Sequence, residues 1–220
     1  MKSTSGRLTP AIFFIVLVAA LGYFVDIYDL VLFSIIRIKS LQGIGITNPS
    51  ELTSLGLLLL NIQMGGMLIG GFVWGIIADK KGRLTVLFGS ILLYSVANIL
   101  NGLVHDIYSF GVLRFIAGFG LAGELGAGIT LVSETMSKEN RGYGTMLVAG
   151  VGLLGAVAAS LIAGHFNWQI SFFVGGGLGI FLLIMRIGVA ESGMYKNLSN
   201  EKISKGNLGL LFSSKERVKK

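Results

Sequence analysis

Long apolar segments alternate with short polar ones along the whole chain. A membrane-spanning helix needs about 20 consecutive, mostly apolar residues. Six segments meet this requirement, at residues 11–37, 55–78, 84–104, 107–132, 144–164 and 168–189. Because the segments after the second, third and fifth spans are very short, consecutive helices are expected to be antiparallel neighbours. The pattern predicts an all-α, polytopic membrane protein with a six-helix transmembrane bundle over 1–190 and a cytoplasmic loop over 191–220.

The composition agrees with this class of protein. Of 220 residues, 53% are hydrophobic and only 13% are charged, whereas a soluble domain carries about 25% charged residues. This argues against a soluble enzyme, and no metal motif, nucleophile elbow or phosphate loop indicates a membrane-embedded one. The chain has no cysteine, which removes thiolate metal sites and disulfide scaffolds. We therefore expect neither enzymatic activity nor a metal or cofactor.

The basic residues indicate how the chain is oriented in the membrane. With the N-terminus inside, most lysines and arginines fall in cytoplasmic segments, including Arg186 and those after it, whereas Arg37 and Lys39 fall outside. The positive-inside rule then places both termini in the cytoplasm. The net charge of +7 is spread over loops, so it does not indicate nucleic-acid binding. Short loops and the lack of a targeting extension suggest a bacterial inner membrane.

Glycines are concentrated in the second, fourth and fifth spans. Residues 118–123 and 150–155 match the dinucleotide fingerprint G-x-G-x-x-G, but both lie inside apolar helices, where that fingerprint does not bind nucleotides. The spacings Gly66 to Gly70 and Gly71 to Gly75 instead predict close helix packing. If the bundle consists of two three-helix units, the second is inverted relative to the first, which is a transporter architecture.

Four charged residues lie within predicted spans and away from the span ends: Asp26, Asp29, Arg114 and Glu124. Each costs at least about 2.5 to 3.5 kcal/mol to insert, so such groups face the bundle interior and usually mark a pathway. A rise of 1.5 Å per residue places Arg114 level with the two aspartates and Glu124 well below them. We expect Arg114 to pair with the aspartates and leave one acid free to exchange a proton. A static ion pair that fixes helix register is the alternative.

Other polar residues in the spans allow two interpretations. Glu124 could handle protons or make a structural hydrogen bond. Asn61 and Gln63 in the second span could line a substrate cavity, but hydrogen bonding between helices is at least as reasonable. Arg114 could also bind a substrate carboxylate, because a guanidinium group binds carboxylates in a bidentate manner.

The junction of the second and third spans carries the most specific motif. It reads Gly75-Ile76-Ile77-Ala78-Asp79-Lys80-Lys81-Gly82-Arg83, with one glycine for close packing and another for a tight turn. This run resembles the signature G-x-x-x-D-R/K-x-G-R/K of the major facilitator superfamily. The resemblance implies that Asp79 and Arg83 lock one conformation by contacting a helix of a second six-helix domain. Gly75, Lys80 and Gly82 are the other residues of the motif.

Three further motifs resemble branches of that superfamily. Asp26-Ile27-Tyr28-Asp29-Leu30 resembles the Asp-Gly-Tyr/Phe-Asp-Leu motif of aromatic-acid/proton symporters, with Ile27 in place of glycine. Arg114, Gly118 and Gly123-Glu124-Leu125-Gly126 are similar to the fourth span of metabolite/proton symporters. Glu134 with Arg141, and Glu191 after the last span, resemble the cytoplasmic charge motifs of sugar porters, although Ala190 replaces their proline.

Together the residues and the resemblance predict the N-terminal half of a transporter that works by alternating access. The expected activity is proton-coupled symport of a small polar or anionic metabolite, with Asp26, Asp29 and Glu124 as proton carriers. The expected partners are the substrate, protons, the lipid bilayer and a second six-helix domain. Two alternatives are a uniporter or exporter on the same fold, and a non-transporting membrane subunit that assembles with another chain.

Overall fold

Six helices make up the described part of the chain, as the hydrophobic pattern predicts. The computed structural model describes residues 10–136 and 140–191. Four of the described helices are long and apolar enough to cross a membrane. Five predicted spans lie inside observed helices, and the third helix ends slightly before its predicted end. The helices are α1 (Pro10–Gly43), α2 (Pro49–Lys81), α3 (Arg83–Asn101), α4 (Ile107–Thr135), α5 (Arg141–His165) and α6 (Trp168–Glu191).

Local chemistry fixes both ends of α2. Pro49 is its first residue, and the Asn48 side chain caps it by accepting the Ser50 N–H at 3.1 Å. At the other end Gly82 has φ +90°, and its N–H donates to the Ala78 carbonyl at 3.0 Å. A positive φ suits glycine because it has no Cβ. The predicted tight turn at Gly82 is confirmed, and α3 begins at the next residue.

The first helix is longer than the hydrophobic pattern predicts. It continues to Gly43, so Arg37 and Lys39, assigned to an outer loop from the sequence, are helical. The Lys39 Nζ donates to the Ala163 carbonyl at 3.4 Å, near the end of α5. A lysine can extend its apolar stem along the bundle and place its charge at the polar end, so Lys39 is compatible with a position in the last turns of this helix.

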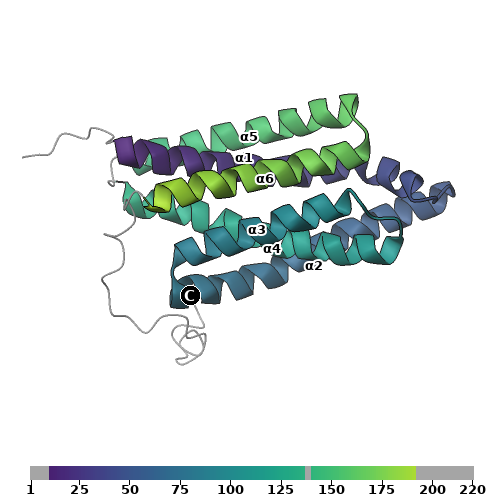
Figure 1. Ribbon diagram of the computed structural model, residues 1–220, viewed down its shortest axis with the longest axis horizontal. Helices are drawn as coiled ribbons and strands as arrows, with labels where there is room; N and C mark the ends of the chain where they lie inside the picture. Colours follow the sequence, from purple (N-terminus) through teal and green to yellow (C-terminus); the bar gives the residue numbers. More distant parts are fainter. Residues whose placement is uncertain (1–9, 137–139, 192–220) are drawn as a thin grey trace, which may run out of the picture.

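The helices pack in two groups that repeat one arrangement. In one group α1 packs against α5 and α6, and in the other α4 packs against α2 and α3 (Figure 1). Contacts of α1 with α4, and of α3 with α6, join the two groups. Exchanging α1 with α4, α2 with α5 and α3 with α6 converts one group into the other. This is the arrangement expected of two inverted three-helix repeats.

Glycines allow the closest helix crossings. A Cβ at Gly66 or Gly70 of α2 would collide with the carbonyls of Phe115 or Phe119 in α4, and a Cβ at Gly155 of α5 would collide with α1. The predicted packing role of Gly66 and Gly70 is therefore confirmed. For Gly71 and Gly75 it is wrong within the described chain, since a Cβ there would meet nothing within 4 Å.

The bundle has two distinct ends. The start of α1, the α2–α3 turn and the end of α6 lie at one end, which we name the Gly82 end (Figure 1). The α1–α2, α3–α4 and α5–α6 connections lie at the other, which we name the Asn48 end. This alternation is what six antiparallel spans require.

Candidate functional site

Five acidic or basic side chains are buried inside the described bundle, one more than the sequence suggests. Asp26, Asp29, Arg114, Glu124 and Arg186 are each at most 5% exposed. The assignment of Arg186 to the cytoplasmic basic residues is wrong, because α6 continues past it to Glu191 and a buried carboxylate pairs with it. Its position inside the predicted span 168–189 was the signal that could have revealed this.

The first cluster joins four helices around Asp29. The Gln63 Nε2 donates to Asp29 Oδ2 at 3.1 Å, and the Arg114 Nη1 lies 3.7 Å from Asp29 Oδ1. The Arg114 Nη2 also donates to Asn98 Oδ1 at 2.6 Å. All four side chains are fully buried. We call Gln63, Asp29, Asn98 and Arg114 the Asp29 cluster.

Two aromatic rings enclose the Arg114 guanidinium group. Its central carbon lies 4.8 Å from the centre of the Phe33 ring and 4.7 Å from that of Phe172. Desolvated cation–π contacts stabilise a cation by about 2 kcal/mol. The rings therefore offset part of the cost of burying Arg114, and they leave it fully buried and out of reach of the surface.

The second cluster lies nearer the Gly82 end. The Arg186 Nη1 donates to Glu124 Oε2 at 2.8 Å and to the Leu87 carbonyl at 3.1 Å, and Nη2 also contacts the Glu124 carboxylate. A Cβ at Gly22 would lie only 2.6 Å from both groups, so a larger residue where α1 crosses them would displace the ends of these side chains. We call Glu124 and Arg186 the Glu124 pair.

Asp26 lies between these two groups and joins neither directly. Its carboxylate is 1% exposed, and Oδ2 has no hydrogen-bond partner among the described residues. The charged side chains whose fields act on it are Glu124, Arg186 and Asp29. The expectation that Arg114 pairs with both aspartates therefore fails for Asp26. Depth along a helix axis does not reveal the lateral position of a side chain, which decides the partner.

The two amides of α2 have different positions. Gln63 is fully buried and binds Asp29, which makes it a hydrogen-bonding residue between helices. Asn61 is exposed on the surface of the bundle. Asn61 is therefore open to contact from outside the bundle, whereas Gln63 is hydrogen-bonded to the aspartate in its interior.

The residues of the signature motif lie at or near the surface of the Gly82 end. Gly75, Asp79 and Lys80 are exposed in the last turns of α2, and Gly82 forms the turn. Arg83 begins α3, but its side chain lies outside the described residues. The motif therefore faces away from the core of this bundle.

The predicted cytoplasmic charge network lies at the same end. Glu134 and Glu191 belong to the last turns of α4 and α6, and their side chains lie outside the described residues. Arg141 begins α5 and is exposed. The network stays a prediction.

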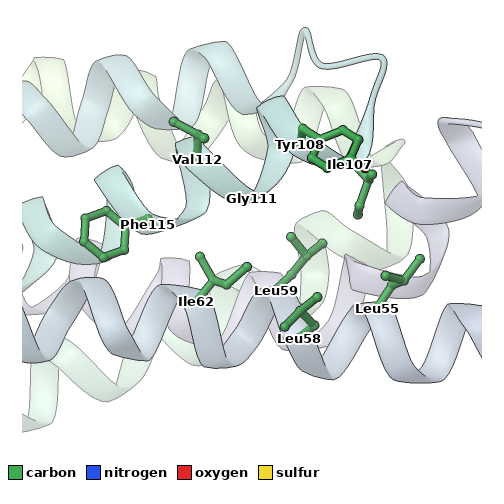
Figure 2. A pocket seen from close by; sticks show the side chains of 9 residues that line it. All are labelled: Leu55, Leu58, Leu59, Ile62, Ile107, Tyr108, Gly111, Val112 and Phe115. Atoms are coloured by element: carbon green, nitrogen blue, oxygen red, sulfur yellow. The ribbon is translucent and has the colours of Figure 1, made fainter.

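An apolar groove of about 430 Å³ lies between α2 and α4 near the Asn48 end. In Figure 2 the α2 side chains Leu55, Leu58, Leu59 and Ile62 line one wall, opposite residues of α4. The Tyr108 hydroxyl is the only side-chain polar group in its lining. The groove therefore does not suit a charged or strongly polar ligand.

A model of the major facilitator superfamily matches residues 12–216, nearly the whole chain. The chain belongs to the major facilitator superfamily. Membership in this transporter family, together with the apolar helices, makes it a multi-pass membrane protein and not an enzyme.

Curated relatives in the family are transporters. The chain is 31% identical over 182 residues to the niacin transporter NiaP of Acinetobacter baylyi. This match covers 80% of this chain and 40% of that protein. It is 32% identical over 179 residues to the sialic acid transporter NanX of Escherichia coli, covering 79% of this chain and 43% of that protein. The chain thus spans less than half the length of these relatives.

Solved structures share the fold. The xylose transporter XylE of Escherichia coli, in an inward open conformation, superposes with a TM-score of 0.72 at 17% identity. The match covers 94% of this chain and 55% of that one. The superposition agrees with the six-helix arrangement described above.

Proposed function

We propose that the chain forms one half of a proton-coupled symporter that carries a small polar or anionic metabolite by alternating access. A second six-helix domain forms the other half, and the substrate site lies between them near the bilayer midplane. Both termini face the cytoplasm, so the Gly82 end is the cytoplasmic end of the bundle.

The observation that carries this proposal is an imbalance of buried charge. Three carboxylates, Asp26, Asp29 and Glu124, share the described interior with two guanidinium groups, Arg114 and Arg186. When all five are ionised, one negative charge is uncompensated. Uncompensated charge in a bundle core is costly, and a single bound proton removes it. The site therefore has the charge balance that a one-proton carrier needs.

Asp26 is the carboxylate that we assign to this proton. Asp29 and Glu124 each contact a guanidinium group, whereas Asp26 has no direct cationic partner among the described residues. Asp29 and Arg114 form the second part of the mechanism, because a proton or a substrate that disturbs their pairing changes the contact between α1 and α4. The Glu124 pair joins α4 to α6 near the cytoplasmic end. Because Arg186 is already paired with Glu124, it compensates the negative charge of Asp26 only in part.

Features of the bundle surface favour the presence of a second domain. Gly65, Gly71 and Gly75 of α2 and Gly150 and Gly164 of α5 have no neighbour within 4 Å of a built Cβ. Large apolar residues such as Leu68, Phe72, Leu153 and Val157 are exposed beside them. Small residues with apolar neighbours suit close helix contact in a membrane. Since α2 and α5 are equivalent in the repeat, both helices can contact a domain of the same construction.

We assign the substrate to small organic acids or similarly sized polar metabolites. The named relatives carry niacin and sialic acid, and a further one, 28% identical, is a benzoate transport protein. Asn61 is the exposed amide of α2 that we propose for substrate contact. Because Arg114 is enclosed by Asp29, Asn98 and two rings, a substrate acts on it through the movement of helices.

Transport by vesicles tests the proposal. Vesicles would contain the chain with its second six-helix domain, and uptake of labelled nicotinate, benzoate and sialic acid would be followed under an inward proton gradient. We expect accumulation of at least one of these acids above equilibrium, lost in Asp26→Asn. Exchange of labelled for unlabelled substrate across the membrane, which needs no net proton movement, should persist.

The alternatives give different results in the same vesicles. A uniporter would equilibrate the substrate across the membrane, and its transport rate would not change when the proton gradient is collapsed. A non-transporting subunit would show no substrate flux. If Asp26→Asn kept gradient-driven accumulation, the assignment of the proton to Asp26 would be wrong. If Asp29→Asn kept it as well, neither aspartate would carry the coupling proton.

A further inference from the structure

Two buried amides of the Asp29 cluster bind opposite charges. The Asn98 Oδ1 of α3 accepts from Arg114 Nη2 at 2.6 Å, and the Gln63 Nε2 of α2 donates to Asp29 Oδ2 at 3.1 Å. A guanidinium group only donates hydrogen bonds, and an ionised carboxylate only accepts them. The charges therefore fix the orientation of both amides, with the Asn98 oxygen toward the cation and the Gln63 nitrogen toward the anion.

The two charges are joined less closely to each other than to these amides. Arg114 Nη1 lies 3.7 Å from Asp29 Oδ1, whereas hydrogen-bonded arginine–carboxylate pairs have distances of about 2.7 to 2.9 Å and are often bidentate. The contact is close enough for an ion pair but too long for a hydrogen bond. Opening it reduces the attraction between the charges without breaking a direct hydrogen bond between them.

Helix packing fixes the positions of the two amides. Both are fully buried. Gly118 lies one turn after Arg114 on α4, and a Cβ there would collide with the Gln63 backbone and lie 3.1 Å from its Cγ. The Gln63 side chain is thus held between α4 and the Asp29 carboxylate of α1. Asn98 also adjoins that carboxylate, but its Nδ2 has no hydrogen-bond partner among the described residues.

Neutral hydrogen-bond partners reduce the cost of opening a buried ion pair. A buried charge that loses its only partner is strongly destabilising. If Arg114 and Asp29 were bonded only to each other, their separation would leave two such charges in the bundle interior. In this cluster the separated guanidinium group keeps its bond to Asn98, and the separated carboxylate keeps its bond to Gln63.

We propose that Asn98 and Gln63 are positioning residues that keep Arg114 and Asp29 hydrogen-bonded while the contact between α1 and α4 opens and closes. Asn98 holds the guanidinium group on α3, and Gln63 stabilises the carboxylate until a proton or the returning arginine compensates its charge. This inference rests on the proposed alternating access. It adds the two residues that lower the cost of opening the ion pair.

The two amides differ in a testable way, because a proton can neutralise the carboxylate but not the guanidinium group. Loss of Gln63 should matter while Asp29 is charged and matter little once it is protonated. Loss of Asn98 should matter at every pH. Asn101 provides a matched control, since it is fully buried three residues further along α3 and its Nδ2 donates to the Ala97 carbonyl at 2.7 Å.

Other titratable groups are the same in all of these variants. Each variant is therefore compared with the unsubstituted protein at the same pH. The buried residues of α2 and α5 in the described chain include no titratable group. Apart from Asp29 and Arg114, the acidic, basic and phenolic side chains buried in the described bundle are Asp26 and Tyr28 of α1, Tyr94 of α3, Glu124 of α4 and Arg186 of α6.

The test measures exchange of labelled for unlabelled nicotinate, benzoate or sialic acid in vesicles that contain the chain with its second six-helix domain. At neutral pH, Asn98→Leu and Gln63→Leu should each lower the maximal exchange rate by about tenfold or more, since a hydrogen bond to a charged group contributes at least that factor. KM should stay within about twofold, because the proposed substrate contacts include neither amide.

Acid should separate the variants. Gln63→Leu should recover to within about twofold of the unsubstituted protein, whereas Asn98→Leu should not recover. Asn98→Asp keeps an acceptor oxygen at the guanidinium group, so it should exchange substrate faster than Asn98→Leu. Asn101→Leu should stay within about twofold of the unsubstituted protein at every pH.

Other outcomes would overturn the inference. Equal losses with the same pH dependence in all three leucine variants would assign the amides a purely structural role. Unchanged exchange in Asn98→Leu and Gln63→Leu would show that the ion pair opens without them, and would leave the proposed function intact. If Asn98→Leu does not fold, a Gln63→Leu defect that persists in acid still contradicts the inference. If the unsubstituted protein exchanged none of the three acids, the proposed function and the inference would fail together.

Discussion

Individual buried charges in this bundle are held by specific partners. Arg114 is shared between Asp29 and Asn98 and enclosed by two aromatic rings. Arg186 binds Glu124 and a backbone carbonyl. Removing one member of a buried pair leaves a desolvated charge, which usually costs more than removing both. The two arginines therefore act as fixed counter-charges, and Asp26 is the acid to which we assign the coupling proton.

The Glu124 pair gives the first prediction. Glu124→Gln and Arg186→Gln should each lower the free energy of unfolding in detergent by about 3 to 5 kcal/mol, because each leaves an unpaired buried charge. The double variant should lose clearly less than the sum of the two. Unfolding of the four proteins measured as a double-mutant cycle provides the coupling energy. Additive losses would mean that the two side chains do not depend on each other.

For individual residues, the sequence predicts which charged side chains are buried better than it predicts the partners of those side chains. The four ionisable residues found inside spans are all buried. The partner of Glu124 was missed because Arg186 lies close to the end of an apolar span and resembles a loop residue. The split between Asp26 and Asp29 was missed because axial depth does not show which neighbouring helix each carboxylate faces.

Helix packing depends on where glycines face another backbone. On α2, Gly66 and Gly70 meet the backbone of α4, whereas Gly71 and Gly75 meet nothing within 4 Å. The small-xxx-small spacing is the same for both pairs, so sequence spacing alone does not reveal which face packs within the chain. The burial of the neighbouring residues makes that distinction.

The two α2 faces give a second prediction. Gly66→Ala should lower the free energy of unfolding by about 1 to 3 kcal/mol, since the new methyl group overpacks the crossing with α4. Gly71→Ala is the matched control and should leave the isolated chain unchanged or slightly more stable, because alanine favours helix. Thermal unfolding of both variants in detergent measures the difference. Equal effects would contradict the assignment of the packed face.

The start of α4 gives a third prediction, on pH. Asp106 Oδ1 accepts the Ser109 N–H at 2.8 Å, and this hydrogen bond lowers the pKa of the Asp106 carboxyl from its ordinary value. A carboxylate near the start of a helix also interacts favourably with the helix dipole. Its contribution to stability should be present above the ordinary pKa and lost as the pH falls through the lowered pKa of the folded state.

Melting curves across pH test this capping role. Asp106→Ala should melt below the unsubstituted chain at neutral pH and approach it in acid. Asp106→Asn keeps a capping oxygen without a titrating group, so its melting temperature should lack this pH-dependent part. A pH dependence identical in all three proteins would exclude a contribution from Asp106.

For the whole molecule, the hydrophobic pattern predicts nearly all of the architecture. Six spans, their order and their inverted repeat follow from runs of apolar residues and the odd number of helices in each unit. What the pattern does not contain is lateral packing: α1 adjoins α5 and α6, and α4 adjoins α2 and α3. These contacts are long-range in sequence and depend on how side chains fit between helices.

The chain without a second six-helix domain is expected to be inactive in transport. A bundle with exposed apolar glycine faces on α2 and α5 contains one wall of the proposed pathway. We expect vesicles that contain only this chain to show no substrate accumulation, whereas vesicles that also contain the second six-helix domain accumulate it. This comparison is the reference for the decisive experiment.

In the proposed mechanism the buried excess of one carboxylate carries the coupling proton. Proton entry, followed with a pH-sensitive dye, and substrate entry, followed with a radiolabel, can be measured in the same vesicles. We predict about one proton per substrate molecule, because one bound proton balances the three buried carboxylates against the two guanidinium groups. In Asp26→Asn, substrate exchange should continue without coupled proton entry. Substrate accumulation with no proton movement in the unsubstituted protein would contradict proton coupling through the buried carboxylates.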